Sequence, residues 1–369
     1  MGINSDKKKQ IAIDDIDYLE LYVGNAKQAA FFFQKLFGFK TIAYSSLETG
    51  NREHTSYVLS NNEITIVVTA ANTSDCYIAD YVKKHGDSIS NIAFTVENLS
   101  KAYEFAVHKG AIVVEEPVSI MEGEGYYAYA KIKAFGEVVH TFVEKKNYSG
   151  VFAPGFVAID DSIVSDKEQP NLLRVDHLAI CVENMNEWIN YYEQIFGFDL
   201  LNSFTKDEIS SKSSSLMTKI LKNGSERVKL SIIEPAVGKK NSQINEFLQY
   251  HNGPGIQHIA LLTDDIIQCI NSLKKNGVEF LYVPKEYYEA LNSRVGEIDE
   301  SINDLRRLQV LVDRDEEGYL LQIFGKPITN RPTLFFEIIQ RKGSRGFGNG
   351  NIKALFEAVE REQARRGNL

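Results

Sequence analysis

The sequence predicts an α+β chain of four βαβββ modules, arranged as two tandem domains whose open mixed sheets curve around cavities. Two internal repeats and an amphipathic segment near the end of the chain support this prediction. Self-similarity at a fixed offset is the signature of a duplicated architecture. The length of 369 residues also fits two domains of ordinary size.

The first repeat relates residues 17–39 to residues 176–198 at a constant offset of 159 positions. Each copy opens with an alternating strand pattern and continues into a stretch whose apolar residues recur at helical spacing. Gly38 and Gly197 follow these stretches, and glycine is the residue that most often ends a helix. We therefore predict a strand followed by a helix at the start of both halves.

The second repeat relates residues 91–94 to residues 258–261 at an offset of 167 positions. A helical pattern follows each strand, at residues 100–109 and 266–276, and each helix is followed by a glycine and then a proline at the same offset. Each half therefore contains two strand–helix–strands units.

We place an N-terminal domain at residues 11–150, a turn-rich linker at 151–171 and a C-terminal domain at 172–369. The chain ends in a predicted helix at 351–366, which follows a glycine-rich approach. This helix is expected to close the C-terminal domain. Its apolar face is formed by Ile352, Leu355, Phe356 and Val359.

Composition narrows the classes of function. The net charge of −9 argues against nucleic acid as a partner, since phosphate binding needs a basic face. No apolar run is long enough to span a bilayer, so no membrane partner is expected. The charged N-terminus does not resemble a secretory signal. Three widely spaced cysteines favour a reducing compartment, and we expect a cytoplasmic protein.

Three residues of the C-terminal half stand out at equivalent positions of the repeated modules. His177, His258 and Glu337 are separated by 81 and 79 positions, so equivalent strands can direct them to one point. A lone strand histidine is more often structural, but two histidines and a carboxylate in register favour a metal site. They form the donor set of non-haem iron(II) oxygenases, which leaves room for substrate and O₂. The N-terminal half has uncharged residues there, namely Tyr18, Asn91 and Thr141.

With these residues in view, the chain resembles the 4-hydroxyphenylpyruvate dioxygenase family of the vicinal-oxygen-chelate superfamily, which includes hydroxymandelate synthase. The resemblance runs from about Asp17 to Leu369 and is strongest after Val175. The stretches that carry it are residues 175–177, 234–240, 242–244, 255–260, 318–324 and 331–341.

The resemblance implies two vicinal-oxygen-chelate domains, of which the N-terminal one has no metal and serves structure or oligomerisation. It implies Fe²⁺ as cofactor, with His177, His258 and Glu337 as ligands and no catalytic residue beyond them. It further implies 4-hydroxyphenylpyruvate and O₂ as substrates, a homodimer or homotetramer, and a C-terminal helix that closes the site.

Two products are compatible with this family. In the dioxygenase branch, which belongs to tyrosine catabolism, the aromatic ring is hydroxylated after decarboxylation and homogentisate forms. In the synthase branch, the benzylic carbon is hydroxylated and 4-hydroxymandelate forms. The way in which the pocket holds the ring decides between the two carbons.

The sequence departs from the usual dioxygenase pattern in the expected pocket. Ser231 and Ile233 stand where Pro and Asn are usual, Ile352 replaces a Phe, and Thr218 replaces a Ser. Ile233 cannot hydrogen-bond a ring hydroxyl, and Ile352 cannot stack on the ring. These changes favour 4-hydroxymandelate synthase, with 4-hydroxyphenylpyruvate dioxygenase as the alternative. Residues 346–348 and 365–369 resemble ordinary dioxygenases instead.

The remaining pocket candidates are polar residues that contact substrate and apolar residues that pack around its ring. Each could also be an ordinary strand or core residue. A non-enzymatic binding protein that kept only the cavity is a more remote alternative, against which the intact triad argues. The additional candidates are Gln243, Gln257, Gln322, Phe324, Phe335, Phe347, Asn351 and Leu355.

Overall fold

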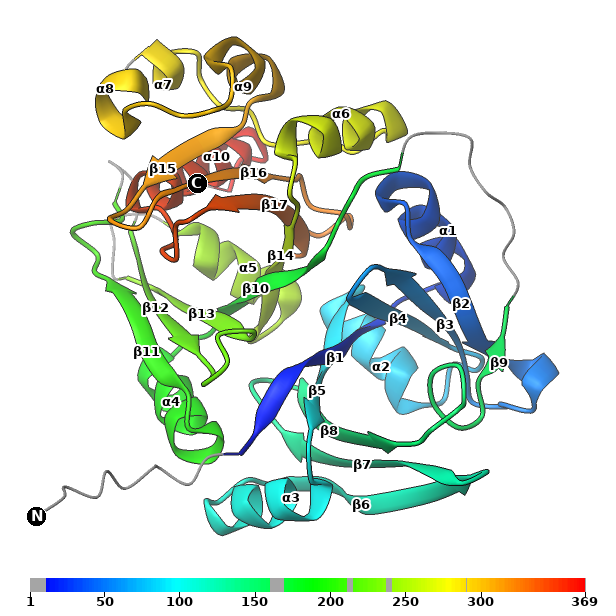
Figure 1. The fold of residues 1–369 in the computed structure, drawn as a ribbon. Helices are drawn as coiled ribbons and strands as arrows, with labels where there is room; N and C mark the ends of the chain where they lie inside the picture. The colour runs from blue at the N-terminus through cyan, green and yellow to red at the C-terminus, as the bar shows by residue number, and fades with distance from the viewer. Residues whose placement is uncertain (1–10, 160–168, 211–214, 237–240, 290, 369) are drawn as a thin grey trace, which may run out of the picture.

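The chain folds around two curved mixed sheets, one from each half (Figure 1). This computed structural model describes residues 11–159, 169–210, 215–236, 241–289 and 291–368. The N-terminal tail, part of the predicted linker (160–168) and part of one family-like stretch (237–240) lie outside these residues. None of the described helices combines the length and the apolar character that a membrane crossing needs.

The N-terminal sheet has nine strands in the order β6-β7-β8-β5-β1-β4-β3-β2-β9. The predicted linker contributes β9, which pairs with β2. The elements of this half are β1 (Ile13–Tyr22), α1 (Ala26–Phe37), β2 (Lys40–Ser45), a 3₁₀ turn (Leu47–Thr49), β3 (His54–Asn61), β4 (Ile64–Ala71), α2 (Tyr77–His85), β5 (Ser88–Val96), α3 (Leu99–His108), β6 (Val113–Glu122), β7 (Gly125–Lys133), β8 (Val139–Lys146) and β9 (Val157–Ala158).

The C-terminal sheet has eight strands in the order β11-β12-β13-β10-β14-β17-β16-β15. Its elements are β10 (Arg174–Cys181), α4 (Met185–Tyr191), a π-helical turn (Tyr192–Phe196), β11 (Asp199–Phe204), β12 (Leu216–Lys222), β13 (Lys229–Pro235), α5 (Gln243–His251), β14 (Gly255–Leu262), α6 (Ile266–Asn276), α7 (Glu286–Glu289), α8 (Leu291–Val295), α9 (Ile302–Leu308), β15 (Leu311–Arg314), β16 (Tyr319–Phe324), β17 (Phe335–Lys342) and α10 (Asn349–Arg365).

These elements form the four predicted βαβββ modules, and the fold prediction is confirmed. In every module the first strand is followed by an Asn or Asp whose side chain accepts a backbone N–H of the next helix. Such residues favour helix starts because they satisfy an otherwise unpaired donor. The four capping residues are Asn25, Asn98, Asn184 and Asp265.

The two modules of each half meet through their first strands, which pair antiparallel: β1 with β5 and β10 with β14. The register is the same in both halves, because Tyr18 pairs with Ala93 and His177 pairs with Ala260. The β1–β5 pair has three register shifts and the β10–β14 pair has two, one of which lies between Val175 and His177. A bulge changes the direction of a neighbouring side chain, so this shift bears on where His177 points.

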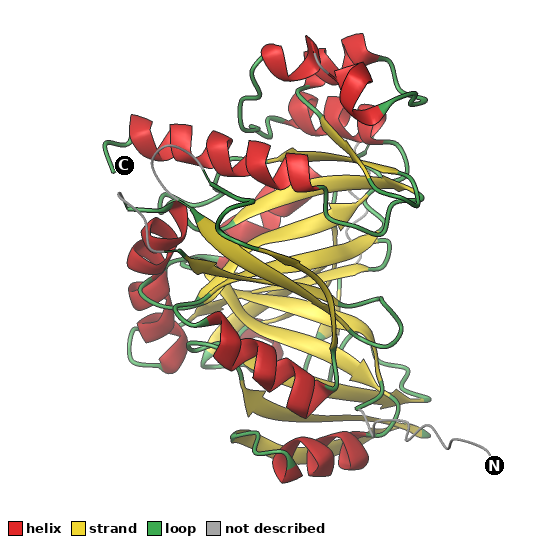
Figure 2. Ribbon diagram, turned by 90° about the vertical axis from the view of Figure 1, so that its left-hand side faces the viewer, coloured by secondary structure: helices red, strands yellow, loops and turns green. Residues whose placement is uncertain are grey.

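Two differences from the predicted modules concern the last one. Helices α7, α8 and α9 are inserted between α6 and β15, and they gather at one end of the molecule (Figures 1 and 2). The closing helix α10 begins at Asn349, two residues before the predicted start. At its far end Arg366 pairs with the buried carboxylate of Glu246 on α5.

The two halves share one apolar core, to which both sheets and several helices contribute. Its aromatic contacts join α1 of the N-terminal half to β17 of the C-terminal half. The ring of Phe336 lies 4.9 Å from Phe37 and 5.8 Å from Phe33, and all three side chains are buried. Packing between the halves therefore supports the back of the strand that carries Glu337.

We predict that Phe336→Ala lowers the free energy of unfolding by about 3–5 kcal/mol, because it leaves a cavity between the halves. Denaturant unfolding measures this loss. Phe31→Ala on α1 is the matched control, since Phe31 is 59% exposed and its change should stay within about 0.5 kcal/mol. Equal losses for the two variants would contradict the shared core.

Candidate metal centre

The structure brings His177, His258 and Glu337 together inside the C-terminal sheet. They come from β10, β14 and β17, three adjacent strands. Register places Glu337 beside Ala260, which in turn pairs with His177. Alternation along these strands directs all three side chains to one face.

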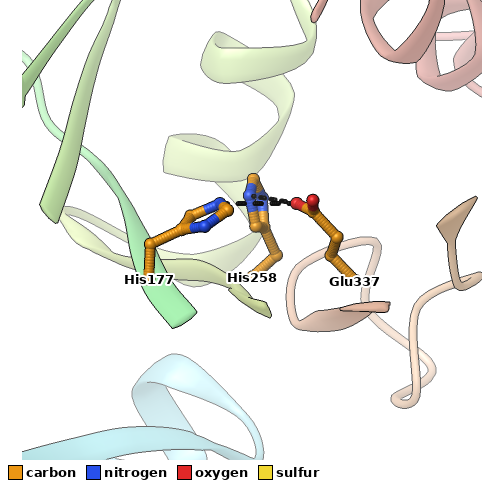
Figure 3. A group of neighbouring side chains, drawn as sticks. All are labelled: His177, His258 and Glu337. Atoms are coloured by element: carbon orange, nitrogen blue, oxygen red, sulfur yellow. Dashed lines mark ion pairs between the residues drawn. The ribbon is translucent and has the colours of Figure 1, made fainter. Parts of the chain in front are cut away.

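The three side chains converge on one point, as Figure 3 shows. The Nε2 atoms of His177 and His258 lie 3.4 Å and 3.5 Å from Glu337 Oε2. One ligand atom from each residue lies within 4.8 Å of the other two, and all three residues are buried. Among the described residues, this is the group of His, Cys, Asp and Glu side chains whose geometry suits a metal ion.

Both imidazoles are oriented through their other nitrogen. His177 Nδ1 lies 2.9 Å from Asp176 Oδ1, and His258 Nδ1 lies 3.3 Å from Gln257 Oε1. Donation from Nδ1 leaves Nε2 as the lone-pair nitrogen in each ring. That is the arrangement in which a histidine binds a metal, with its tautomer set by an outer partner.

Asp176 is fully buried and is held by Arg341 through two hydrogen bonds, Nε to Oδ2 at 2.8 Å and Nη2 to Oδ1 at 2.7 Å. Burial alone would raise the pKa of Asp176, but the Arg341 guanidinium and the bond from His177 hold it well below its ordinary value. Asp176 therefore stays ionised and keeps accepting the His177 proton.

The two imidazoles differ in their electrostatics. Burial lowers the pKa of His177, but the nearby carboxylates of Glu337 and Asp176 outweigh it and raise the pKa overall. Burial and then the neighbouring His177 hold the pKa of His258 well below its ordinary value. His258 is therefore neutral and ready to act as a ligand.

The carboxylate of Glu337 is also positioned by a side-chain network. Gln322 Nε2 on β16 donates to Glu337 Oε1 at 2.7 Å. Asn351 Nδ2 at the start of α10 donates to Gln322 Oε1 at 2.8 Å. One carboxylate oxygen is thus hydrogen-bonded, and the other faces the two imidazoles.

These donors fit a divalent transition metal. A buried carboxylate beside two imidazoles is costly without a cation, and two imidazole nitrogens with one carboxylate oxygen form the facial set used for iron(II). The residues present would hold such an ion through His177 Nε2, His258 Nε2 and Glu337 Oε2.

A small pocket opens at the triad. Most predicted pocket residues line it together with the triad: Thr218, Ser231, Ile233, Gln243, Gln257, Gln322, Phe324, Phe347, Ile352 and Leu355. Two predicted residues lie behind this wall. Phe335 stacks on His258 with ring centroids 4.9 Å apart, and Asn351 contacts Gln322.

Three further lining residues were not predicted as site residues: Leu216, Ile244 and Phe356. A signal existed for each of them. Leu216 lies two positions from Thr218 on β12, and Ile244 follows Gln243 at the start of α5. Phe356 lies on the same helical face as Ile352, which the spacing had already indicated.

The substituted positions lie together on one side of the pocket. Thr218 Oγ1 and Ser231 Oγ are 2.9 Å apart and satisfy each other. Ile233 belongs to an apolar cluster with Phe347 and Phe356, against which Ile352 packs. The wall is therefore aliphatic at the positions where the usual dioxygenase pattern has Asn and Phe.

Comparison with known proteins identifies the class that this fold and site define. The model of the Glyoxalase/Bleomycin resistance protein/Dioxygenase superfamily matches residues 15–139 and 174–323. A 4-hydroxyphenylpyruvate dioxygenase from Yarrowia lipolytica is 42% identical, covering 96% of this chain and 93% of the relative. One from Dictyostelium discoideum is 41% identical, covering 97% and 100%.

A solved structure of a 4-hydroxymandelate synthase mutant from Streptomyces coelicolor is also similar, with a TM-score of 0.85 and 36% identity over 95% of this chain and 99% of that one. The chain thus belongs to the glyoxalase and dioxygenase superfamily, and within it to the 4-hydroxyphenylpyruvate dioxygenase family. The predictions of this family and of an enzyme are confirmed. The names of the similar curated proteins favour the dioxygenase alternative over the synthase that the pocket residues favoured.

We predict that Asp176→Asn costs about 3–5 kcal/mol of stability in the chelator-treated protein, because it leaves the Arg341 guanidinium, whose side chain is only 12% exposed, without its counter-charge. Asp17→Asn is the matched control at the equivalent position of the N-terminal half. The Asp17 side chain is 8% exposed, but its partner Lys145 is 33% exposed and can turn to water, so the loss should cost less, about 1 kcal/mol. Denaturant unfolding of both variants measures the difference, and equal costs would refute the special role of Asp176.

Proposed function

We propose that this chain is an iron(II)-dependent enzyme that converts 4-hydroxyphenylpyruvate and O₂ into homogentisate and CO₂. The observation that carries the proposal is the buried convergence of His177, His258 and Glu337 in a pocket. Relatives that are named 4-hydroxyphenylpyruvate dioxygenase match nearly the full chain and support the product.

Each part of the site has a distinct task. Bound iron(II) would supply the one-electron chemistry and the open positions that O₂ and a 2-oxo acid require. Asp176 and Gln257 hold the imidazoles in the ligand tautomer, and Gln322 holds the carboxylate. These contacts fix the geometry before substrate arrives, which is what positioning contributes to rate.

The rest of the pocket accommodates an aromatic substrate. Phe324 and Phe347 offer ring faces, and Gln243 and Gln257 offer amides to a polar group. The cavity volume is about 50 Å³, below the roughly 300–1,000 Å³ of small-molecule sites. Helix α10 contributes Ile352 and Leu355 to the lining, so an outward movement of this helix would enlarge the cavity. We infer that α10 moves outward to admit substrate.

The activity test is incubation with Fe²⁺, 4-hydroxyphenylpyruvate and O₂, followed by chromatography against authentic standards. Mass alone is insufficient, because homogentisate and 4-hydroxymandelate are isomers. We expect homogentisate, with one CO₂ released per O₂ consumed. Glu337→Ala should abolish turnover and weaken Fe²⁺ binding by more than about 100-fold, since a charged ligand is lost.

The control for the metal effect is His108→Ala, which changes an exposed histidine on α3. It should leave turnover and metal binding unchanged. Wild-type protein that binds Fe²⁺ but neither consumes O₂ nor decarboxylates the 2-oxo acid would refute the proposed function. Retained iron affinity in Glu337→Ala would refute the ligand set.

A second candidate product is 4-hydroxymandelate, and a specific observation favours it. Ile233 and Ile352 line the pocket and replace the Asn and Phe of the usual dioxygenase pattern. Without an amide partner or a stacking plate, the ring can turn and present its benzylic carbon to the oxidant.

For the case in which the wild type forms 4-hydroxymandelate, we predict that the double variant Ile233→Asn with Ile352→Phe raises the fraction of homogentisate in the product. The added amide and ring would hold the substrate ring toward the oxidant. Chromatography of the double variant and the wild type under the same conditions measures the product ratio. If the wild type forms 4-hydroxymandelate and the double variant gives the same product ratio, residues other than Ile233 and Ile352 direct hydroxylation.

The proposal also includes domain limits at 11–150 and 172–369 and an N-terminal half without a metal. It further includes a homodimer or homotetramer and a cytoplasmic location. In the N-terminal half, Thr141 donates to Asn91 Oδ1 at 3.0 Å, so two of the triad-equivalent residues satisfy each other without a metal.

A further inference from the structure

The closing helix α10 begins without a cap of its own. Its N-cap residue is Gly348, at a φ of 71°, which has no side chain to accept the first backbone N–H groups. Asp313 on β15 supplies the missing acceptor. Its Oδ2 accepts from Gly350 N at 2.6 Å and from Asn351 N at 3.3 Å. A carboxylate at this end also interacts favourably with the helix dipole.

The close approach explains two glycines at the start of the helix, the N-cap Gly348 and Gly350 in its first turn. A Cβ on Gly348 would lie 2.9 Å from Asp313 Cβ. A Cβ on Gly350 would lie 2.8 Å from Arg294 Nη1 and 3.3 Å from Asp313 Oδ2. A side chain at Gly348 would crowd Asp313 and would be strained by the positive φ, and one at Gly350 would displace Arg294 from its place beside Asp313.

A hydrogen-bonded chain runs from this first turn to the metal carboxylate. Asn351 Nδ2 reaches Glu337 through Gln322, as described above. The other end of the same amide is held from outside the pocket, because Tyr287 on α7 donates its hydroxyl proton to Asn351 Oδ1 at 2.9 Å. Both ends of the Asn351 amide are therefore specified.

Tyr287 is itself held in place. Its hydroxyl oxygen accepts the N–H of Val312 at 2.8 Å, and its ring lies 4.4 Å from the Arg294 guanidinium carbon. Val312 O lies 2.8 Å from the same hydroxyl and competes for its proton, but Arg294 Nη2 also donates to Val312 O at 3.0 Å. Val312 O therefore already has one donor, whereas Tyr287 is the donor that the described contacts give for Asn351 Oδ1, so we assign the single phenol proton to Asn351.

We propose that Tyr287 and Asp313 are positioning residues that dock the first turn of α10 and, through Asn351 and Gln322, set the orientation of the Glu337 carboxylate. The inserted helices α7 and α8, present in the fourth module, carry Tyr287 and Arg294 to this turn. Docking of the first turn of α10 and orientation of the Glu337 carboxylate are thus coupled. The catalytic consequence rests on the proposed function, whereas the docking itself does not.

The docking is tested by hydrogen–deuterium exchange of the chelator-treated protein. In Tyr287→Phe, the backbone amides of residues 350–352 should exchange about threefold to tenfold faster, as loss of one neutral hydrogen bond implies. Asp313→Asn should accelerate the same amides by at least as much. Unchanged exchange at these amides in both variants would overturn the proposal.

The chain offers a matched control for each change. Tyr288 is adjacent and buried, and its hydroxyl has no hydrogen-bond partner among the described residues. Tyr288→Phe removes the same atom and should leave exchange at 350–352 unchanged. Glu316→Gln removes an exposed charge from the hairpin that carries Asp313 and should also have no effect. Equal acceleration in Tyr287→Phe and Tyr288→Phe would mean that any loss of a hydroxyl in α7 destabilises this region. It would overturn the specific role of Tyr287.

The connection to the carboxylate is tested by a double-mutant cycle. Tyr287→Phe should lower kcat about threefold to tenfold with a smaller change in KM, and less product should form per O₂ consumed. In the Asn351→Ala background, the same change should alter kcat by less than about 1.5-fold, because the chain is already broken. Additive effects would overturn the chain through Asn351. Wild-type protein without turnover would refute the proposed function, while the exchange data would still decide the docking.

Discussion

The burial of the Glu337 carboxylate between two imidazoles is the interaction on which the rest of the C-terminal half depends. Burying an unpaired carboxylate in this position would cost folding free energy, so neighbouring groups must offset its charge. The compensation extends outward through Gln322 on one side and through His177, Asp176 and Arg341 on the other. Arg341 also donates to Gly346 O at 2.6 Å, in the segment that leads to α10. The triad and the closing helix are therefore supported by one connected polar network.

The N-terminal half shows what the same fold does without this constraint. Tyr18, Asn91 and Thr141 occupy the register positions of the triad, and their uncharged groups can satisfy one another. Phe152 packs on Tyr18 with ring centroids 5.2 Å apart. No counter-ion is needed there, so a duplicated scaffold can keep one half for packing while the other carries the chemistry. The fold alone would not distinguish the halves, because function depends on the site and not on the architecture.

The asymmetry extends to how each cavity is covered. In the C-terminal half, α10 is docked at its start by Asp313 and at its end by the pair between Arg366 and Glu246. Both contacts lie outside the pocket, so the helix can be anchored without polar groups intruding on the apolar wall formed by Ile352 and Phe356. The same wall carries Ile352, one of the residues that depart from the usual dioxygenase pattern. The pocket wall and the docking contacts thus use different parts of one helix, namely side chains along its length and groups at its two ends.

The sequence by itself determined the modules, because strand and helix periodicity and the Asn or Asp caps act locally and repeat at fixed offsets. It also indicated the triad, because equivalent strands of repeated modules point equivalent side chains to one place. Tertiary structure alone decided the outer partners. No local sequence pattern predicts the partners of Tyr287, Asp313 and Arg341. Their partners lie 64, 38 and 165 positions away in the chain. Such contacts depend on how the inserted helices and β15 pack beside α10, which no local periodicity encodes.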